Sequence, residues 1–135
     1  MRALVVDDQR IFAEYPDYVW THATTSQEGI EYLVVSGPWD EVWLDHDLGM
    51  ESEGSGYDLV QELVMAFENG DLRPTDVLAP DGRVLVHSMN PAGAERMVQA
   101  LTRYFQVARI DPTPYLDFNA MYSQDRNPYL AGPRR

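Results

Sequence analysis

The chain contains no cysteine and no lysine, and it has no long apolar run. The absence of cysteine excludes disulfide bonds, thiolate metal ligands and a cysteine nucleophile. No stretch approaches the ~20 apolar residues that are needed to cross a bilayer. The N-terminus enters a predicted strand directly and lacks the pattern of a signal peptide. We therefore expect a soluble, cytoplasmic protein that does not act on membranes.

Positive charge is also scarce. All ten basic residues are arginine, and 22 acidic residues bring the net charge to −12. Nonspecific binding to DNA or RNA requires cationic side chains that neutralise phosphates, so the charge argues against this class of function. A small phosphate ester, or a single RNA end that is held through a metal ion, remains a compatible partner.

Strand-like and helix-like patterns alternate along the chain, which is long enough for one domain with a core. This alternation predicts an α/β three-layer sandwich around a parallel five-stranded sheet with the flavodoxin-like order 2-1-3-4-5. The predicted strands cover residues 2–6, 18–23, 40–45, 83–88 and 106–111. The predicted helices cover residues 27–36, 57–68 and 91–105, with a short helical turn ending at residue 15 and a long loop over 71–82.

The end of the chain has a different pattern. Residues 112–135 contain four prolines and show no helical period. We therefore assign residues 1–111 to the domain and residues 112–135 to an irregular tail. The aromatic residues of this tail are predicted to pack on the domain or on a protein partner; they are Tyr115, Phe118, Tyr122 and Tyr129.

Two acidic motifs follow predicted buried strands. Asp7 and Asp8 follow the apolar residues 3–6, and the triplet Asp45-His46-Asp47 follows residues 41–44. The carboxyl ends of parallel strands meet at one crevice, where clustered carboxylates repel each other unless a cation offsets their charge. We therefore predict that Asp7, Asp8 and Asp45 hold a divalent metal, Mg²⁺ or Mn²⁺. The alternative is that Asp7 and Asp8 only cap the following turn.

Two histidines lie at the ends of neighbouring predicted strands. His46 and His87 can exchange protons near neutral pH, and in the predicted strand order one phosphate fits between them. We assign both histidines, together with Asp47, as candidate catalytic residues. Each histidine also has a structural interpretation: His46 as a loop residue that orders Asp45, and His87 as a residue bonded to the backbone.

Three further residues are candidate phosphate ligands. Arg10 can clamp phosphate oxygens with its guanidinium, although it can also simply pair with a nearby carboxylate. Asn90 precedes Pro91 and is a predicted N-cap, and the first amides of the helix that follows form an anion site. Ser88, next to His87, is the third candidate.

The strand-end residues resemble the receiver domain of bacterial response regulators. The similarity rests on Val5-Val6-Asp7-Asp8, on Leu44-Asp45 and on Ser88. It implies that the first acidic pair binds Mg²⁺, that Asp45 accepts a phosphoryl group and that Ser88 supplies the nearby hydroxyl. Receivers also place a lysine after strand five, where this chain reads Ala108-Arg-Ile-Asp-Pro-Thr-Pro. That departure counts against ordinary phosphorelay signalling.

A narrower resemblance, to the receiver-like family named for cyclic-phosphate processing, extends from Ala3 to about Leu101. It rests on four strings: Asp7-Asp8-Gln9-Arg10, Leu44-Asp45-His46-Asp47-Leu48-Gly49, Gly56-Tyr57-Asp58, and His87-Ser88-Met89-Asn90-Pro91-Ala92-Gly93-Ala94-Glu95-Arg96-Met97. This resemblance implies a receiver fold that hydrolyses or binds a cyclic phosphate, such as a 2′,3′-cyclic end on a nucleotide or an RNA. The rival hypotheses are a binding module without turnover and a signalling receiver that uses Asp45.

Overall fold

The computed structural model describes residues 1–122, so the predicted packing of Tyr129 lies outside the described residues. Five parallel strands form a single sheet with the order β2-β1-β3-β4-β5, which confirms the predicted topology. The strands are β1 (Arg2–Val6), β2 (Val19–Ala23), β3 (Trp39–Leu44), β4 (Leu78–Val86) and β5 (Gln106–Arg109).

Three long helices alternate with these strands, and each begins at a side-chain cap. The caps are Thr25, Ser55 and Asn90, whose side chains accept hydrogen bonds from backbone amides of the first turn. The helices are α1 (Ser26–Val35), α2 (Gly56–Asn69) and α4 (Pro91–Thr102). Helix α2 ends at Gly70, which adopts a left-handed conformation with φ of 78°.

The structure differs from the sequence prediction in three connecting segments. No helical turn ends at residue 15; instead Phe12 forms a β-bridge with Leu116. The predicted loop over 71–82 contains the short helix α3 (Pro74–Val77) and the first half of β4. Residues 112–122 are not wholly irregular, because they contain the 3₁₀ helix η1 (Thr113–Tyr115) and the one-turn helix α5 (Phe118–Met121).

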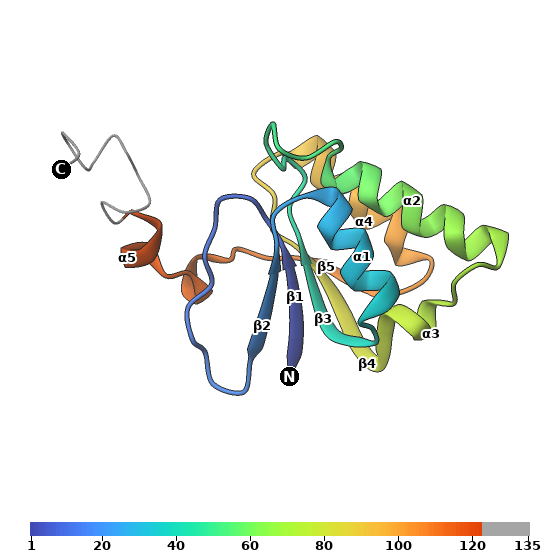
Figure 1. The fold of residues 1–135 in the computed structure, drawn as a ribbon, viewed down its shortest axis with the longest axis horizontal. Helices are drawn as coiled ribbons and strands as arrows, with labels where there is room; N and C mark the ends of the chain where they lie inside the picture. The colour runs from blue at the N-terminus through green and yellow to red at the C-terminus, as the bar shows by residue number, and fades with distance from the viewer. Residues whose placement is uncertain (123–135) are drawn as a thin grey trace.

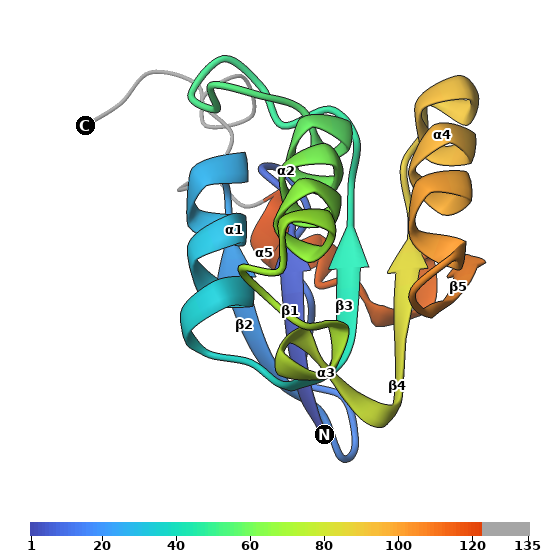
Figure 2. The same ribbon diagram turned by 90° about the vertical axis from the view of Figure 1, so that its right-hand side faces the viewer.

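Helices α1, α2 and α4 all cover the same face of the sheet (Figures 1 and 2). Alternate strand residues point to this face, so Leu4, Val42 and Val84 pack against the helices. From the helices, Leu59 and Met97 are fully buried in the same core. This face is the helical layer that the sequence predicts.

An aromatic layer covers the opposite face of the sheet, where the three-layer prediction places helices. It is built from the loop before β2 and the segment after β5, which lie on the side away from α1 and α2 (Figure 1). Phe12 and Trp43 are buried there with ring centroids 5.3 Å apart, and Tyr115 lies 5.0 Å from Trp43. The third layer therefore exists, but irregular segments with large rings form it.

Backbone hydrogen bonds tie these two segments together. Ala13 N donates to Tyr115 O at 2.8 Å, and Asp117 N donates to Ile11 O, also at 2.8 Å. Together with the β-bridge at Phe12, these bonds fix the loop that follows β1 against the C-terminal segment. None of the helices in residues 1–122 is both long enough and apolar enough to span a membrane.

Candidate functional site: a carboxylate pocket at the rim of the sheet

The carboxyl ends of β1, β3 and β4 lie next to each other at one rim of the sheet. Backbone bonds continue the ladder past the strand ends: Asp45 N donates to Val6 O and His87 N donates to Leu44 O, both at 3.0 Å. The first residues after β3 and β4 therefore continue the hydrogen-bond ladder of the sheet. This pairing places Asp7, Asp45 and His87 side by side.

Asp7 is the buried centre of the site, and four donors saturate its carboxylate. Its Oδ1 accepts from the amides of Gln9 (2.8 Å) and Arg10 (3.0 Å), while its Oδ2 lies 3.0 Å from Arg10 Nη1 and 2.8 Å from His87 Nε2. Burial alone would raise the pKa of Asp7, but the hydrogen bonds from His87 and the two amides lower that pKa to about 2. Asp7 is therefore ionised at neutral pH.

The pKa values of Asp8 and Asp45 are shifted in the opposite direction to that of Asp7. Burial and the neighbouring charge of Asp7 raise the pKa of both carboxyl groups. Within residues 1–122, no other residue donates a hydrogen bond to the Asp8 carboxylate, and Asp45 Oδ2 has one contact, at 3.3 Å from Arg10 Nη1. One oxygen from each of Asp7, Asp8 and Asp45 can be chosen so that all three lie within 4.8 Å of one another. The two less saturated carboxylates thus face a site that favours a cation.

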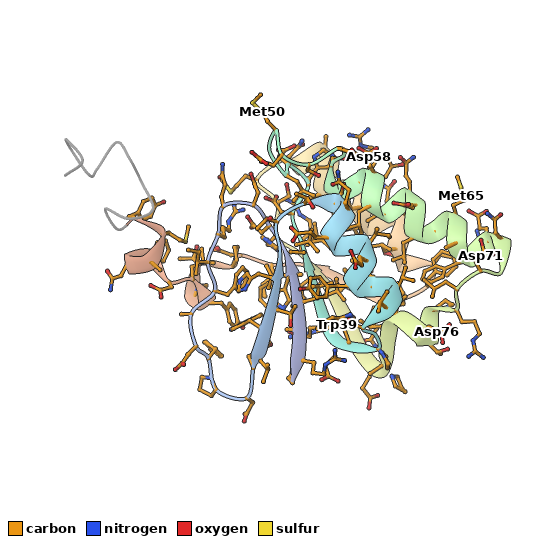
Figure 3. The ribbon with its side chains drawn as sticks, in the orientation of Figure 1. Trp39, Met50, Asp58, Met65, Asp71 and Asp76 are labelled. Atoms are coloured by element: carbon orange, nitrogen blue, oxygen red, sulfur yellow. The ribbon has the colours of Figure 1, made fainter. Side chains whose placement is uncertain are left out.

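Gly49 makes room for Asp8. It has a φ of +73°, and a Cβ atom at this position would overlap the Asp8 carboxylate. The loop that carries Gly49 rises above the rim, with Met50 projecting from its tip (Figure 3). Gly49 therefore has a specific steric role at the site.

Arg10 bridges the carboxylates through a single nitrogen, Nη1. Burial alone would lower its pKa, but the contacts with Asp7 and Asp45 raise it, so the guanidinium stays charged. In the described part of the chain, no hydrogen bond involves Nε or Nη2 of Arg10. These two groups can donate to a phosphate while Nη1 stays on the carboxylates.

His46 lies on the helical side of the rim. Its ring packs against the first turn of α4, where a Cβ on Gly93 would overlap the imidazole. His46 Nδ1 is 2.8 Å from Asp47 Oδ1 and 3.4 Å from Asn90 Nδ2. Asp47 itself is 70% exposed in its side chain, so it orients the histidine from the solvent side. The structure thus brings together the candidate catalytic residues His46 and Asp47 with Asn90, a candidate phosphate ligand.

His87 lies on the aromatic side, away from His46. Its side chain is 0% exposed and packs between Phe12 and Trp43, with ring centroids 5.8 and 6.1 Å away. The expectation that one phosphate fits between His46 and His87 is therefore wrong for this geometry. Strand alternation explains the separation, because His87 follows Leu85 by two residues and shares its face. The direct contact of His87 is with Asp7.

Ser88 and Asn90 order the turn that leads into α4. Ser88 is buried, and its hydroxyl accepts a hydrogen bond from Asn90 N at 3.0 Å. The Asn90 side chain caps α4 by accepting from Gly93 N at 2.9 Å, as its N-cap interpretation predicts. Both polar groups are therefore engaged within the protein, and neither lines the carboxylate pocket.

A pocket of about 240 Å³ lies at the rim beside the carboxylates. Its lining residues are Asp8, Gln9, Arg10, Asp45, Asp47, Gly49 and Met89. The donor set consists only of carboxylate oxygens, which suits a hard cation such as Mg²⁺ or Mn²⁺. Asp8 and Asp45 have the oxygens available to hold it, and Gly49 leaves the space that this arrangement requires. The residues present therefore fit a divalent metal.

Among the comparisons with known proteins, the family match is the one that bears on this site. No curated protein sequence matches the chain. A solved structure of a fusion that contains the yeast Spc42 trimeric coiled coil is similar over 80% of this chain, with 14% identity and a TM-score of 0.42; the match spans 65% of that chain's length. The family described as the cyclic-phosphate processing receiver domain matches residues 2–103. This match covers every residue assigned to the site, and the chain is therefore a member of the cyclic-phosphate processing receiver family.

Proposed function

We propose that the protein binds Mg²⁺ or Mn²⁺ and hydrolyses a cyclic phosphate ester, with 2′,3′-cyclic nucleotides or RNA ends as the substrate class. The observation that carries this proposal is the convergence of Asp7, Asp8 and Asp45 within 4.8 Å beside the charged Arg10. The family match supports a cyclic phosphate as the ligand. A divalent cation on Asp8 and Asp45 would neutralise the charge that develops on the phosphate oxygens.

The reaction requires one bond to form and one to break. A water oxygen adds to phosphorus, one ester P–O bond breaks, and the product is a phosphomonoester with a free hydroxyl. One proton leaves the water, and another reaches the departing oxygen. We assign this transfer to His46, which lies between the pocket residues Asp45 and Asp47 in the chain; Asp47 engages its Nδ1, and no hydrogen bond within residues 1–122 involves its Nε2. Arg10 holds the phosphate through Nε and Nη2.

His87 has a different role in this proposal. Its Nε2 contacts Asp7 Oδ2 at 2.8 Å, and burial keeps it from touching a substrate directly. His87 therefore acts as a positioning residue that fixes the Asp7 carboxylate. Asp7 in turn holds Arg10, so the effect of His87 reaches the phosphate through two contacts.

The test is a panel of 2′,3′-cyclic and 3′,5′-cyclic nucleotides and RNA with a 2′,3′-cyclic end, assayed with Mg²⁺ or Mn²⁺. We expect metal-dependent ring opening that falls by 10²-fold or more in His46→Ala, because general acid–base groups contribute about that much. His22→Ala is the matched control, since His22 is exposed on β2 and lies outside the site. Equal turnover by the two variants, or none by the wild type, would contradict the proposal.

A second candidate function is a binding module without turnover. The placement of the histidines favours it, because neither His46 nor His87 lines the carboxylate pocket, whereas hydrolysis needs both a base and an acid. In this case calorimetry in the presence of Mg²⁺ would show binding of a cyclic nucleotide, and product analysis of the same sample would show intact ligand. Release of a phosphomonoester would exclude this candidate.

A further inference from the structure

A second, larger hollow lies beside the carboxylate pocket. It has a volume of about 590 Å³ and lies between the residues that follow β4 and those at the end of β5. Met89, whose residue is 83% exposed, lines both hollows. A ligand held by the carboxylate pocket can therefore extend over Met89 into this groove. The residues that line this groove include Met89, Arg109, Ile110 and Pro112.

Arg109 brings a positive charge to the groove, whose lining also includes the acidic Asp111. It is the last residue of β5, it is exposed, and within residues 1–122 it forms no salt bridge with a carboxylate. Asp111 lines the same groove, where its Oδ1 accepts from Thr113 N at 3.0 Å and from Thr113 Oγ1 at 2.6 Å; within residues 1–122 it forms no salt bridge with Arg109. Arg10, by contrast, is bound to two carboxylates. Arg109 is thus the available cation for an anion in the groove.

The register of the sheet sets the distance between the two sites. Leu44 pairs with Val86, and Val86 pairs with Arg109, so the backbone of Arg109 lies two strand spacings, about 10 Å, from the end of β3. Asp45 follows Leu44 directly. The relevant ligand is a ribose with one phosphate on its 2′ and 3′ oxygens and another on its 5′ oxygen. With the cyclic phosphate at the carboxylate pocket, the 5′-phosphate extends towards Arg109, and the long arginine side chain can reach it.

We propose that the groove binds the nucleoside part of the substrate and that Arg109 binds a second phosphate on its 5′ oxygen. This inference rests on the proposed function, and it narrows the substrate class to cyclic nucleotides with a phosphate at both ends of the ribose. The guanidinium forms paired hydrogen bonds with phosphate oxygens. Met89 and Pro112 provide apolar contact for the sugar and the base, which needs no sequence-specific donor.

The experiment compares a nucleoside 2′,3′-cyclic phosphate with the same compound bearing a 5′-phosphate. In the wild type we expect the 5′-phosphate to lower KM by roughly tenfold with little change in kcat, since charged hydrogen bonds add affinity of this order. Arg109→Ala should lose this preference, raising the KM of the 5′-phosphorylated compound far more than that of the unphosphorylated compound. Arg109→Lys should restore part of it. Arg103→Ala, which removes an exposed arginine at the end of α4, is the control and should behave as the wild type.

Three outcomes would overturn the inference: no preference in the wild type, equal loss for both compounds in Arg109→Ala, or the same loss in Arg103→Ala. A third substrate, a dinucleotide with a 2′,3′-cyclic end, carries a phosphodiester at the same 5′ position. A lower KM for the dinucleotide than for the 5′-phosphorylated nucleotide identifies an RNA end as the source of the second phosphate, and the reverse identifies a free nucleotide.

A separate measurement distinguishes this inference from the proposed hydrolysis. If no compound is turned over, calorimetry with Mg²⁺ still measures the affinity of the two cyclic nucleotides. Tighter binding of the 5′-phosphorylated compound to the wild type, and equal binding of both by Arg109→Ala, would support the groove without catalysis. Absence of binding by both compounds would overturn the groove as well.

Discussion

Nη1 of Arg10 lies 3.0 Å from Oδ2 of Asp7, and the same nitrogen lies 3.3 Å from Oδ2 of Asp45. One arginine nitrogen therefore lies between Asp7 and Asp45, and Asp45 is one of the two carboxylates that would hold a metal ion. Asp7 has no lone pair to spare for a metal while Arg10 is in place, because four donors already surround it. Arg10 and a divalent cation are thus expected to compete for the same negative charge.

Replacement of Arg10 tests this competition. We expect Arg10→Ala to tighten Mn²⁺ binding by roughly tenfold, about 1.4 kcal/mol, and to lower the stability of the metal-free protein because the carboxylates then repel each other. Calorimetric titration with Mn²⁺ measures the first effect, and thermal unfolding in chelator measures the second. Arg96→Ala removes an arginine that stacks on Tyr57 and serves as the control. Unchanged or weaker Mn²⁺ binding in Arg10→Ala would show that the arginine does not compete.

Alanine substitutions at Gly49 and Gly70 form a matched pair that tests the steric role of Gly49. Both have positive φ, 73° and 78°, so alanine at either position costs about 1–2 kcal/mol of backbone strain. The added Cβ meets nothing at Gly70 but overlaps the Asp8 carboxylate at Gly49. We therefore expect both variants to lose similar stability in chelator, and only Gly49→Ala to bind Mn²⁺ more weakly. Equal metal affinity in the two variants would remove the steric argument.

The low pKa of Asp7 predicts a component of acid denaturation. The folded state holds this pKa at about 2, below the unfolded value of 3.8, so Asp7 contributes stability above pH 4 that is lost as the pH falls towards 2. The shift corresponds to about 2 kcal/mol. In chelator, the free energy of unfolding of the wild type should fall more steeply over this range than that of Asp7→Asn. Parallel pH profiles would contradict the assignment.

His87 should contribute to stability more than the other two histidines. His87→Ala removes a buried ring between Phe12 and Trp43 and leaves the buried Asp7 carboxylate without one of its donors. We expect a loss of roughly 3 kcal/mol in unfolding free energy, measured by urea denaturation. His22→Ala, at an exposed position, should stay within about 0.5 kcal/mol of the wild type. Similar losses in the two variants would argue against the buried contact.

The strand order and the location of the acidic site were predictable from local patterns. Buried strands with acidic residues at their carboxyl ends give the site in any parallel sheet, and Asn90-Pro91 marks the start of α4 without tertiary information. The short helix α3 was missed, although Pro74 at its first turn and the Asp76 carboxylate on the Arg73 amide form a local start signal.

The face of the sheet on which each site residue lies was not predictable in the same way. Alternation places His87 on the side of Leu85, but sequence alone does not say that every long helix covers the other face. That asymmetry depends on the aromatic segments around Phe12 and Tyr115, which pair across about 100 residues of sequence. The saturation of Asp7 and the steric role of Gly49 likewise arise from contacts between distant segments.

The backbone pairing of residues 11–13 with residues 115–117 has a mechanical consequence. The segment that carries Arg10 is held by β1 at one end and by the C-terminal segment at the other. A pulling force on the C-terminal segment is therefore transmitted through these backbone hydrogen bonds to the loop that carries Arg10, which contacts Asp7 and Asp45. Truncation of the chain before Tyr115 would expose Phe12 and Trp43 to water, and it would also remove the backbone hydrogen bonds that hold the loop carrying Arg10.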